Sequence, residues 1–372
     1  MKKKILFFIH DLGQGGAEKV LVNLTNNLDS EKYDVTVMTL FGNGINEQFL
    51  LPHIKLKSVF KRPFIANSQF LKLLSPKILH KWFIKESYDI EVSFLEGISA
   101  RIISGCTNKN TKLVSWVHVQ QHLIKYASYS FKSKKEAIKC YNRFDETVCV
   151  SQAVLKDFCN IFNFKKPCRV LYNVIESNVV SKLSNEEIDF KTDSGYSLIA
   201  VGSLKESKGY RRLFNVVNQL ITNRYDFHLY VLGLGPLKDD LEKFITDNNL
   251  FSSITLLGYD TNPYKYISKC DLFVCASFAE GFSTAATEAL IVGTPVCTVD
   301  VSGMKEMLGE NNEFGVVVEN SEEGLYKGIK SLLDNPEKLE FYKQKALERG
   351  KCFSIEGTVS AIEDLFDSLL EV

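Results

Sequence analysis

The stretch Tyr196-Ser197-Leu198-Ile199-Ala200-Val201-Gly202 starts a second series of strands and helices in a chain that already contains one. It follows residues 175–195, a weakly patterned segment suited to an interdomain linker. On both sides, short apolar runs alternate with amphipathic helical stretches, the pattern of a parallel sheet covered by helices. A chain of 372 residues is also long for a single core, which stops growing near ~250–300 residues. The sequence predicts α/β domains at 1–180 and 181–355, and a C-terminal helix at 356–372 packing back toward the first domain.

The expected elements follow from this alternation of apolar runs. In the first half, we expect strands at 5–9, 33–40, 90–94, 113–117 and 146–150, and helices at 17–28 and 152–158. In the second half, we expect strands at 196–202, 228–233, 253–257, 272–276 and 295–299, and a last helix at 355–370.

Composition indicates a soluble globular protein, with 45% hydrophobic and 24% charged residues, and the absence of targeting signals leads us to expect a cytoplasmic one. The apolar run after Met1-Lys2-Lys3-Lys4 stops at His10, too early for a signal peptide, and no run reaches the ~20 apolar residues of a membrane span. None of the nine cysteines forms a C-x2-C pair, so we expect reduced core thiols and no zinc site.

The net charge of zero conceals two halves of opposite sign. Residues 1–184 carry 27 Lys and Arg against 15 Asp and Glu, and residues 185–372 carry 18 against 30. Such asymmetry indicates two domains that face different partners.

Two glycine clusters follow strands, at 11–18 and 233–238. Glycines there let the backbone approach a ligand and direct N–H groups at an anion. Neither cluster is a dinucleotide fingerprint, because Glu18 stands where the third glycine of the first would be and the second also lacks its third glycine. Hydride transfer is therefore disfavoured. The alternative to ligand binding is that both loops contain glycines only because their turns require them.

The most informative segment runs from Cys275 to Leu290, where a strand leads through a glycine loop into a helix. It carries Glu280 before the helix and Glu288 inside it. Backbone N–H groups at Phe282–Ala285 form a nest for hydroxyls or phosphate. One carboxylate can reach a sugar ring while the other takes the paired hydroxyls of a ribose, because a carboxylate accepts two hydrogen bonds from a vicinal diol.

These features resemble glycosyltransferase family 4, the retaining enzymes of capsule, exopolysaccharide and lipopolysaccharide assembly. The shared motifs run in the family's order over nearly the whole chain. They are Glu280 and Glu288 as Glu-x7-Glu, Gly15-Gly16-Ala17-Glu18, Val150–Val154, Tyr172-Asn173-Val174, Val201-Gly202 with Lys208-Gly209, Leu232–Leu237, and Leu257-Gly258-Tyr259 with Asn262-Pro263-Tyr264. The resemblance implies a GT-B fold, two Rossmann-like domains facing each other across a cleft. The N-terminal domain would bind the acceptor and the C-terminal domain the nucleotide sugar.

The resemblance also implies roles for individual residues. Glu280 contacts the transferred sugar, Lys208 neutralises the diphosphate, and His118 lies across the cleft near the donor sugar. A lone histidine after a buried strand is otherwise more often structural. The implied donor-binding residues are Gly15, Gly16, Ser203, Lys205, Gly258, Tyr259, Phe282, Ser283, Thr284, Ala285 and Glu288. Ser203 departs from the family's usual arginine, which leaves Lys205, Arg211 and Arg212 as candidates for the second phosphate cation.

The expected reaction moves a sugar from a nucleoside-diphosphate sugar, UDP rather than GDP, to a glycan or lipid-linked glycan acceptor. No Asp-x-Asp metal clamp occurs in the chain, so we expect neither a metal nor a cofactor. Retention would come from attack on the face that the leaving group vacates, and a covalent Glu280 intermediate is the alternative. The rival functions are a GT-B sugar-nucleotide epimerase and a catalytically degenerate partner subunit that binds nucleotide sugar.

Residues 49–85 contain no Asp or Glu and combine lysines with aromatic residues. No base-reading motif accompanies them, which argues against nucleic-acid binding. A solvated basic surface with aromatics in the core is one interpretation. We favour a patch that rests on anionic lipid at the inner face of the plasma membrane.

Overall fold

The computed structural model describes residues 2–64, 67–188 and 195–371 and divides the chain into two compact units. Unit 1 combines the chain up to Val174 with the chain from Glu356 onward, and unit 2 is Ile175–Ile355. The division falls at Val174/Ile175, at the start of the linker predicted at 175–195. That segment contains a helix at Ser177–Leu183, and its residues 189–194 lie outside the described residues.

Unit 1 is built on a parallel sheet of seven strands in the order β3-β2-β1-β4-β5-β6-β7. Its strands are β1 (Lys3–Ile9), β2 (Tyr33–Phe41), β3 (Lys55–Phe60), β4 (Ile90–Ser93), β5 (Lys112–Val117), β6 (Glu146–Cys149) and β7 (Cys168–Val170). Its helices are α1 (Gly16–Asn27), η1 (Ile45–Phe49), α2 (Asn67–Leu73), α3 (Pro76–Phe83), α4 (Ile98–Ile103), α5 (Ile124–Ala127), α6 (Lys134–Tyr141) and α7 (Gln152–Phe162).

Unit 2 is built on a parallel sheet of six strands in the order β10-β9-β8-β11-β12-β13. Its strands are β8 (Tyr196–Val201), β9 (Phe227–Leu232), β10 (Ile254–Gly258), β11 (Leu272–Cys275), β12 (Val296–Val299) and β13 (Val316–Val318). Its helices are α8 (Ser177–Leu183), η2 (Glu206–Lys208), α9 (Tyr210–Thr222), α10 (Lys238–Asp247), α11 (Tyr264–Ile267), α12 (Thr284–Ile291), α13 (Met304–Leu308), α14 (Glu322–Leu333) and α15 (Pro336–Gly350).

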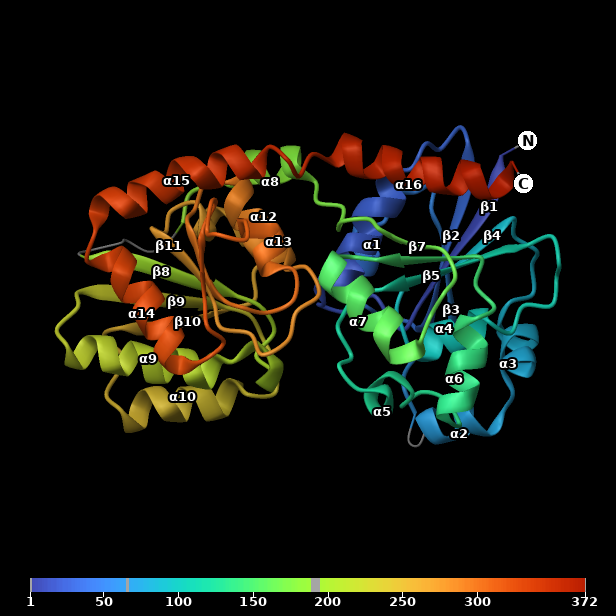
Figure 1. Cartoon of the computed structure of the whole chain (residues 1–372), viewed down its shortest axis with the longest axis horizontal. Coiled ribbons are helices and arrows are strands. Elements are labelled where there is room, and N and C mark those ends of the chain that lie inside the picture. The colour runs from blue at the N-terminus through green and yellow to red at the C-terminus, as the bar shows by residue number, and fades with distance from the viewer. Residues whose placement is uncertain (1, 65–66, 189–194, 372) are drawn as a thin grey trace. The chain divides into compact units, whose positions relative to one another are not determined.

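Helices cover both faces of the unit 2 sheet. Figure 1 shows α9, α10 and α14 along one face and α8, α12 and α15 along the other. The inner strands β8, β9, β11 and β12 are therefore buried on both faces, which explains why they read as continuous apolar runs rather than alternating ones. α8 belongs to this unit because Val180 packs against Ile175 and Tyr264 and because Asn262 Nδ2 donates to the carbonyl of Leu183 at 3.0 Å.

The last helix, α16 (Ile355–Leu370), lies with unit 1 from Glu356 onward. Phe366 is fully buried and meets Phe7 and Tyr33 edge-on, with ring centroids 6.1 Å apart in both pairs. The hydroxyl of Tyr33 donates to Asp367 at 2.7 Å, and Glu363 accepts from the backbone N–H of Asp29 at 2.8 Å. The apolar face of this amphipathic helix thus packs against the rest of unit 1, and polar residues at the border of that face make the hydrogen bonds. None of the helices among the described residues is both long and apolar enough to span a bilayer.

Candidate active site

In both sheets the chain first adds strands on one side of the strand that comes first in sequence and then on its other side. The loops that leave the sheet at this reversal define the candidate sites. In unit 2 the chain winds from β8 toward β10 on one side and from β11 toward β13 on the other. Ligands of open α/β sheets bind at such a switch point, outside the carboxyl ends of the strands. The loops after β8 and β11 meet there, since the N–H of Phe278 donates to the carbonyl of Ser207 at 2.7 Å.

Lys208 and Glu280 form an ion pair at this switch point. Lys208 Nζ lies 2.6 Å from Glu280 Oε1, and the two side chains are 28% and 10% exposed. Burial opposes the charge on Lys208, but the attraction of the Glu280 carboxylate outweighs it and raises the pKa of the lysine. The unit 2 site therefore holds a fixed positive charge beside a partly buried carboxylate, within reach of solvent.

Ser277 and Cys275 also contact the Glu280 carboxylate, and neither was predicted from the sequence. Ser277 Oγ, which is buried, donates to Glu280 Oε1 at 2.6 Å, and Cys275 Sγ lies 4.0 Å from the same oxygen. The signal was available, because Ser277 precedes Glu280 by three residues in the loop that the sequence singled out. A short hydrogen bond from a buried hydroxyl fixes the orientation of the carboxylate.

Arg212, one of the candidates for the second phosphate cation, is 4% exposed and has its guanidinium bound to this loop. Its guanidinium donates to the carbonyls of Ala276 at 2.6 Å and Ser277 at 2.7 Å and to Asn320 at 2.7 Å. Gly209 permits this packing, because it has φ +67° and a Cβ there would lie 2.0 Å from the carbonyl oxygen of Ala276. Arg211, another candidate from the sequence, pairs on the surface with Asp240 at 2.8 Å.

The loop ends at the N-terminus of α12. Ser283 is the N-cap, and its hydroxyl accepts from the N–H of Ala286 at 3.3 Å. This leaves the first-turn N–H groups of Thr284 and Ala285 without a partner inside the helix. Phe282 and Glu288 are both buried, at 5% and 3% exposed. The arrangement offers an oriented dipole and N–H groups beside the charged pair.

The remaining predicted residues of unit 2 lie on the same sheet edge. Ser203 and exposed Lys205 are in the loop after β8, Gly258 ends β10, and Tyr259 follows it. The loop after β9 joins them: the N–H of Gly233 donates to the carbonyl of Gly258 at 2.7 Å, and the N–H of Leu204 donates to the carbonyl of Leu234 at 2.9 Å. The structure brings Lys208 and Glu280 into contact, while Gly258 and Tyr259 lie at the end of a strand two places from β8.

Gly15, Gly16 and His118 belong to unit 1, whose switch point lies between β1 and β4. Gly15 is the N-cap of α1, which begins at Gly16. The Glu18 carboxylate folds back over Gly15, where a Cβ would meet Glu18 Oε2 at 2.0 Å. Any larger residue at position 15 would therefore have to displace the Glu18 carboxylate.

His118 directly follows β5 and is 6% exposed. Burial lowers the pKa of its imidazole to about 3, so the ring is neutral at physiological pH. Its backbone N–H donates to Glu96 Oε2 at 3.0 Å, and Glu96 was not predicted as a site residue. Burial raises the pKa of the Glu96 carboxyl group. A carboxyl group whose pKa is raised by burial in a loop at the carboxyl edge of a sheet is a candidate for function.

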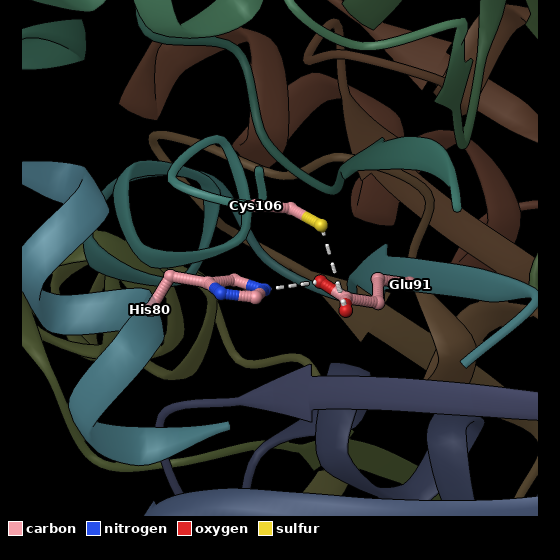
Figure 2. Close-up of side chains that lie close together, drawn as sticks. All are labelled: His80, Glu91 and Cys106. Atoms are coloured by element: carbon pink, nitrogen blue, oxygen red, sulfur yellow. Dashed lines mark hydrogen bonds and ion pairs between the residues drawn. The ribbon is translucent and has the colours of Figure 1, made fainter. Parts of the chain in front are cut away.

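Among the described residues, three side chains of metal-ligand type converge in unit 1: His80, Glu91 and Cys106 (Figure 2). His80 Nε2 lies 2.7 Å from Glu91 Oε2, and Cys106 Sγ lies 3.8 Å from Glu91 Oε1. Although burial opposes the charge, hydrogen bonds to Cys106 and Glu91 raise the pKa of His80 to about 9. A protonated imidazole beside a buried carboxylate accounts for the cluster as an ion pair that joins α3 to β4. Glu91 also lies near the amino end of β4, at the edge opposite to His118.

Two family models match the chain, one on each half. Residues 14–179 match the model described as Glycosyltransferase Family 4, and residues 184–349 match Glycosyl transferases group 1. A curated relative from Campylobacter jejuni, N-acetylgalactosamine-N,N'-diacetylbacillosaminyl-diphospho-undecaprenol 4-alpha-N-acetylgalactosaminyltransferase, is 31% identical over 361 residues, covering 94% of this chain and 96% of that protein.

Solved structures share the fold at low sequence identity. Sucrose-phosphate synthase from Thermosynechococcus elongatus superposes with a TM-score of 0.82 at 16% identity, covering 99% of this chain and 100% of that one. HepE from Anabaena, solved with UDP and glucose, superposes with a TM-score of 0.79 at 20% identity, covering 98% and 100%. These likenesses confirm the predicted α/β class with two Rossmann-like domains.

Proposed function

This chain belongs to glycosyltransferase family 4, and from that premise we propose that it transfers a sugar from a UDP-sugar to a glycan acceptor with retention of configuration. The observation that carries the proposal is the Lys208–Glu280 pair at the β8/β11 switch point of unit 2. The UDP assignment draws on HepE, which was solved with UDP and glucose. The acceptor assignment draws on the Campylobacter relative, whose name specifies a diphospho-undecaprenol saccharide.

The charges of the site suit a departing nucleoside diphosphate. When the bond from the anomeric carbon to the diphosphate breaks, its electron pair stays on the diphosphate oxygen. Lys208 and the N–H groups of Thr284 and Ala285 stabilise that negative charge. Glu280 faces the positive charge that develops on the sugar ring, and Glu288 holds the ribose diol. Because Lys208 and the helix dipole supply the positive charge, we propose that the reaction needs no metal ion.

Retention follows from attack on the face that the diphosphate leaves. The acceptor hydroxyl forms the new bond to the anomeric carbon, and its proton passes to the departing diphosphate oxygen. The alternative, a covalent glycosyl–Glu280 intermediate, requires the carboxylate to be available as a nucleophile. Contacts of Lys208 and Ser277 with Glu280 Oε1 support electrostatic stabilisation by the carboxylate instead.

The exposed face of α3 supports a membrane-bound site of action. Ile78 and Trp82, four residues apart and 41% and 52% exposed, lie on one ridge of the helix. Lys77 and Lys81 are exposed at the same spacing next to them, and exposed Lys85 follows the helix and donates to the carbonyl of Lys81 at 3.0 Å. A lysine near an anionic surface contributes ~1 kcal/mol, and aromatic side chains insert at the headgroup boundary. We propose that this face, the α3 patch, rests on anionic lipid of the cytoplasmic leaflet, where a lipid-linked acceptor is found.

A donor panel tests the proposed reaction. UDP-glucose, UDP-N-acetylglucosamine, UDP-N-acetylgalactosamine and GDP-mannose are compared by thermal shift and then by release of nucleotide with an undecaprenyl-diphosphate saccharide as acceptor. We expect a UDP-sugar to be turned over and the anomeric coupling in the product's NMR spectrum to match the donor's. Conversion of the donor to an epimer without acceptor, or binding without turnover, contradicts the proposal.

Vesicle binding tests the α3 patch. We expect wild-type protein to sediment with phosphatidylglycerol vesicles at low salt, to be released as salt rises, and to bind phosphatidylcholine vesicles weakly. Replacing Lys77, Lys81 and Lys85 by Glu should release it while leaving UDP binding intact. The matched control replaces Lys134, Lys135 and Lys139 of α6, which are also exposed, by Glu. Equal release by both variants would mean that net charge, not this face, drives binding.

A further inference from the structure

Two carboxylates hold the segment that follows β5 in unit 1. Glu96, in the loop after β4, accepts from the backbone N–H of His118 at 3.0 Å and from Gln121 Nε2 at 3.4 Å. Asp157, on α7, accepts from the N–H groups of Gln121 at 2.8 Å and His122 at 3.2 Å. The segment is therefore fixed at its first residue by one carboxylate and further along by the other.

Packing against an aromatic ring fixes the position of the His118 imidazole, and one of its nitrogen atoms has no hydrogen-bond partner among the described residues. Its ring lies against Phe94, with centroids 4.8 Å apart, and Phe94 packs in turn against Trp116 at 5.1 Å. His118 Nε2 is buried and has no hydrogen-bond partner among the described residues. A buried polar atom without a partner costs stability, so its retention points to a ligand that completes it.

Glu96 is itself held in a constrained turn. Gly97 has φ +81°, a conformation that favours glycine, and a Cβ at this position would lie 3.0 Å from Ser130 Oγ. The N–H of Gly97 donates to the hydroxyl of Tyr141 at 3.3 Å, and the N–H of Phe94 donates to the carbonyl of Phe8 at 2.9 Å. The backbone on both sides of Glu96 is therefore anchored, to β1 through Phe94 and to α6 through Gly97.

We propose that Glu96 is a positioning residue for the transfer reaction: its carboxylate fixes the backbone at His118 and thereby keeps the imidazole buried and aimed at the substrate. This rests on the proposed function for the substrate. Without the carboxylate, the N–H of His118 loses its acceptor and the strand end relaxes. Misplacement of a reacting or binding group by about 1 Å lowers rates on the order of 10²-fold.

Histidine NMR tests the positioning without any assay of activity. In protein labelled on its histidine rings, with His118→Gln used for assignment, the wild-type His118 signal should not titrate between pH 5 and 8. In Glu96→Ala we expect the ring to gain solvent and to titrate toward the ordinary value of about 6.5. Glu96→Gln keeps an acceptor oxygen and should resemble wild type. Asp157→Ala, the matched control, removes the second carboxylate and should leave the His118 titration unchanged.

Kinetics of a double-mutant cycle supply the second measurement. We expect His118→Ala to lower kcat about 10²-fold and Glu96→Ala about 10-fold or more, with donor affinity nearly unchanged. The double variant should be no slower than His118→Ala, because Glu96 acts through His118. The inference is overturned if the kcat losses of the two single variants multiply in the double variant. It is also overturned if the His118 signal of Glu96→Ala titrates as in wild type. If wild type turns over no donor, the proposed function fails, and the NMR comparison still decides whether Glu96 positions His118.

Discussion

The two sheets share the order of six strands, with β7 as a seventh in unit 1, and their carboxyl edges differ in electrostatics. In unit 2 the switch point carries a Lys208–Glu280 ion pair in which the lysine is held charged. In unit 1 the residue after β5 is a buried neutral imidazole, and Glu96, which holds it, has a raised pKa. The contrast teaches that a doubly wound sheet fixes where a site lies but not what it binds. Unit 2 presents a charged pair at its carboxyl edge, and unit 1 presents a neutral imidazole.

Removing the charge of Glu280, the acidic member of the unit 2 ion pair, should have the largest effect on the reaction. Glu280→Gln keeps the shape of the side chain but removes the negative charge that we propose faces the transferred sugar. We expect kcat to fall at least ~10²-fold with a modest change in UDP affinity, because the interaction acts mainly in the transition state. Steady-state kinetics with the preferred UDP-sugar measure the first quantity and calorimetric titration with UDP the second. Near-normal turnover would remove Glu280 from the proposed mechanism.

A smaller effect is expected when Glu280 keeps its charge but loses its orientation. Ser277→Ala removes the 2.6 Å hydrogen bond to Oε1 and should lower kcat about 10-fold, since the carboxylate can still pair with Lys208. Ser302→Ala is the matched control: its hydroxyl donates to the carbonyl of Gly281 at 3.3 Å in the same loop. Equal losses in both variants would indicate general loosening of the loop.

The ion pair of unit 1 should appear in stability rather than in catalysis. Because the pKa of His80 is raised to about 9, the stabilisation is complete below the ordinary value of about 6.5 and is lost as the pH rises through 9. We expect the wild-type melting temperature to fall by a few °C more between pH 6.5 and 9.5 than that of His80→Gln. His53→Gln, at an exposed histidine, should follow wild type, and parallel curves for all three proteins would contradict the ion pair.

Chelation should have the smallest effect. With Lys208 and the α12 dipole as the proposed positive charges, dialysis against EDTA should change the initial transfer rate less than 2-fold. Added Mg²⁺ or Mn²⁺ should have a similarly small effect. Loss of transfer with EDTA and its recovery with Mg²⁺ would show that a metal ion neutralises the diphosphate.

Several elements were readable from the sequence because their signals are local. β1, β2, α1 and α16 lie within one or two residues of their predicted ranges. The two strands are short runs rich in apolar residues and the two helices have apolar residues at helical spacing, and both patterns are visible in the sequence. β3 was not predicted, because its lysines resemble a charged surface segment and its pairing with β2 joins residues far apart in the chain. β7 and β13 have three residues each, too few to show a period.

The sequence by itself determined the family, the two α/β series and the loop that carries Glu280, because motif order, apolar period and glycine placement are properties of neighbouring residues. Tertiary structure decided which side chains act together. Lys208 meets Glu280 across 72 positions of sequence, Arg212 turns inward to hold two carbonyls, and Glu96 reaches the backbone of His118. These contacts arise because parallel strands bring their carboxyl ends to one edge however far apart they lie in the chain, so no local pattern records them.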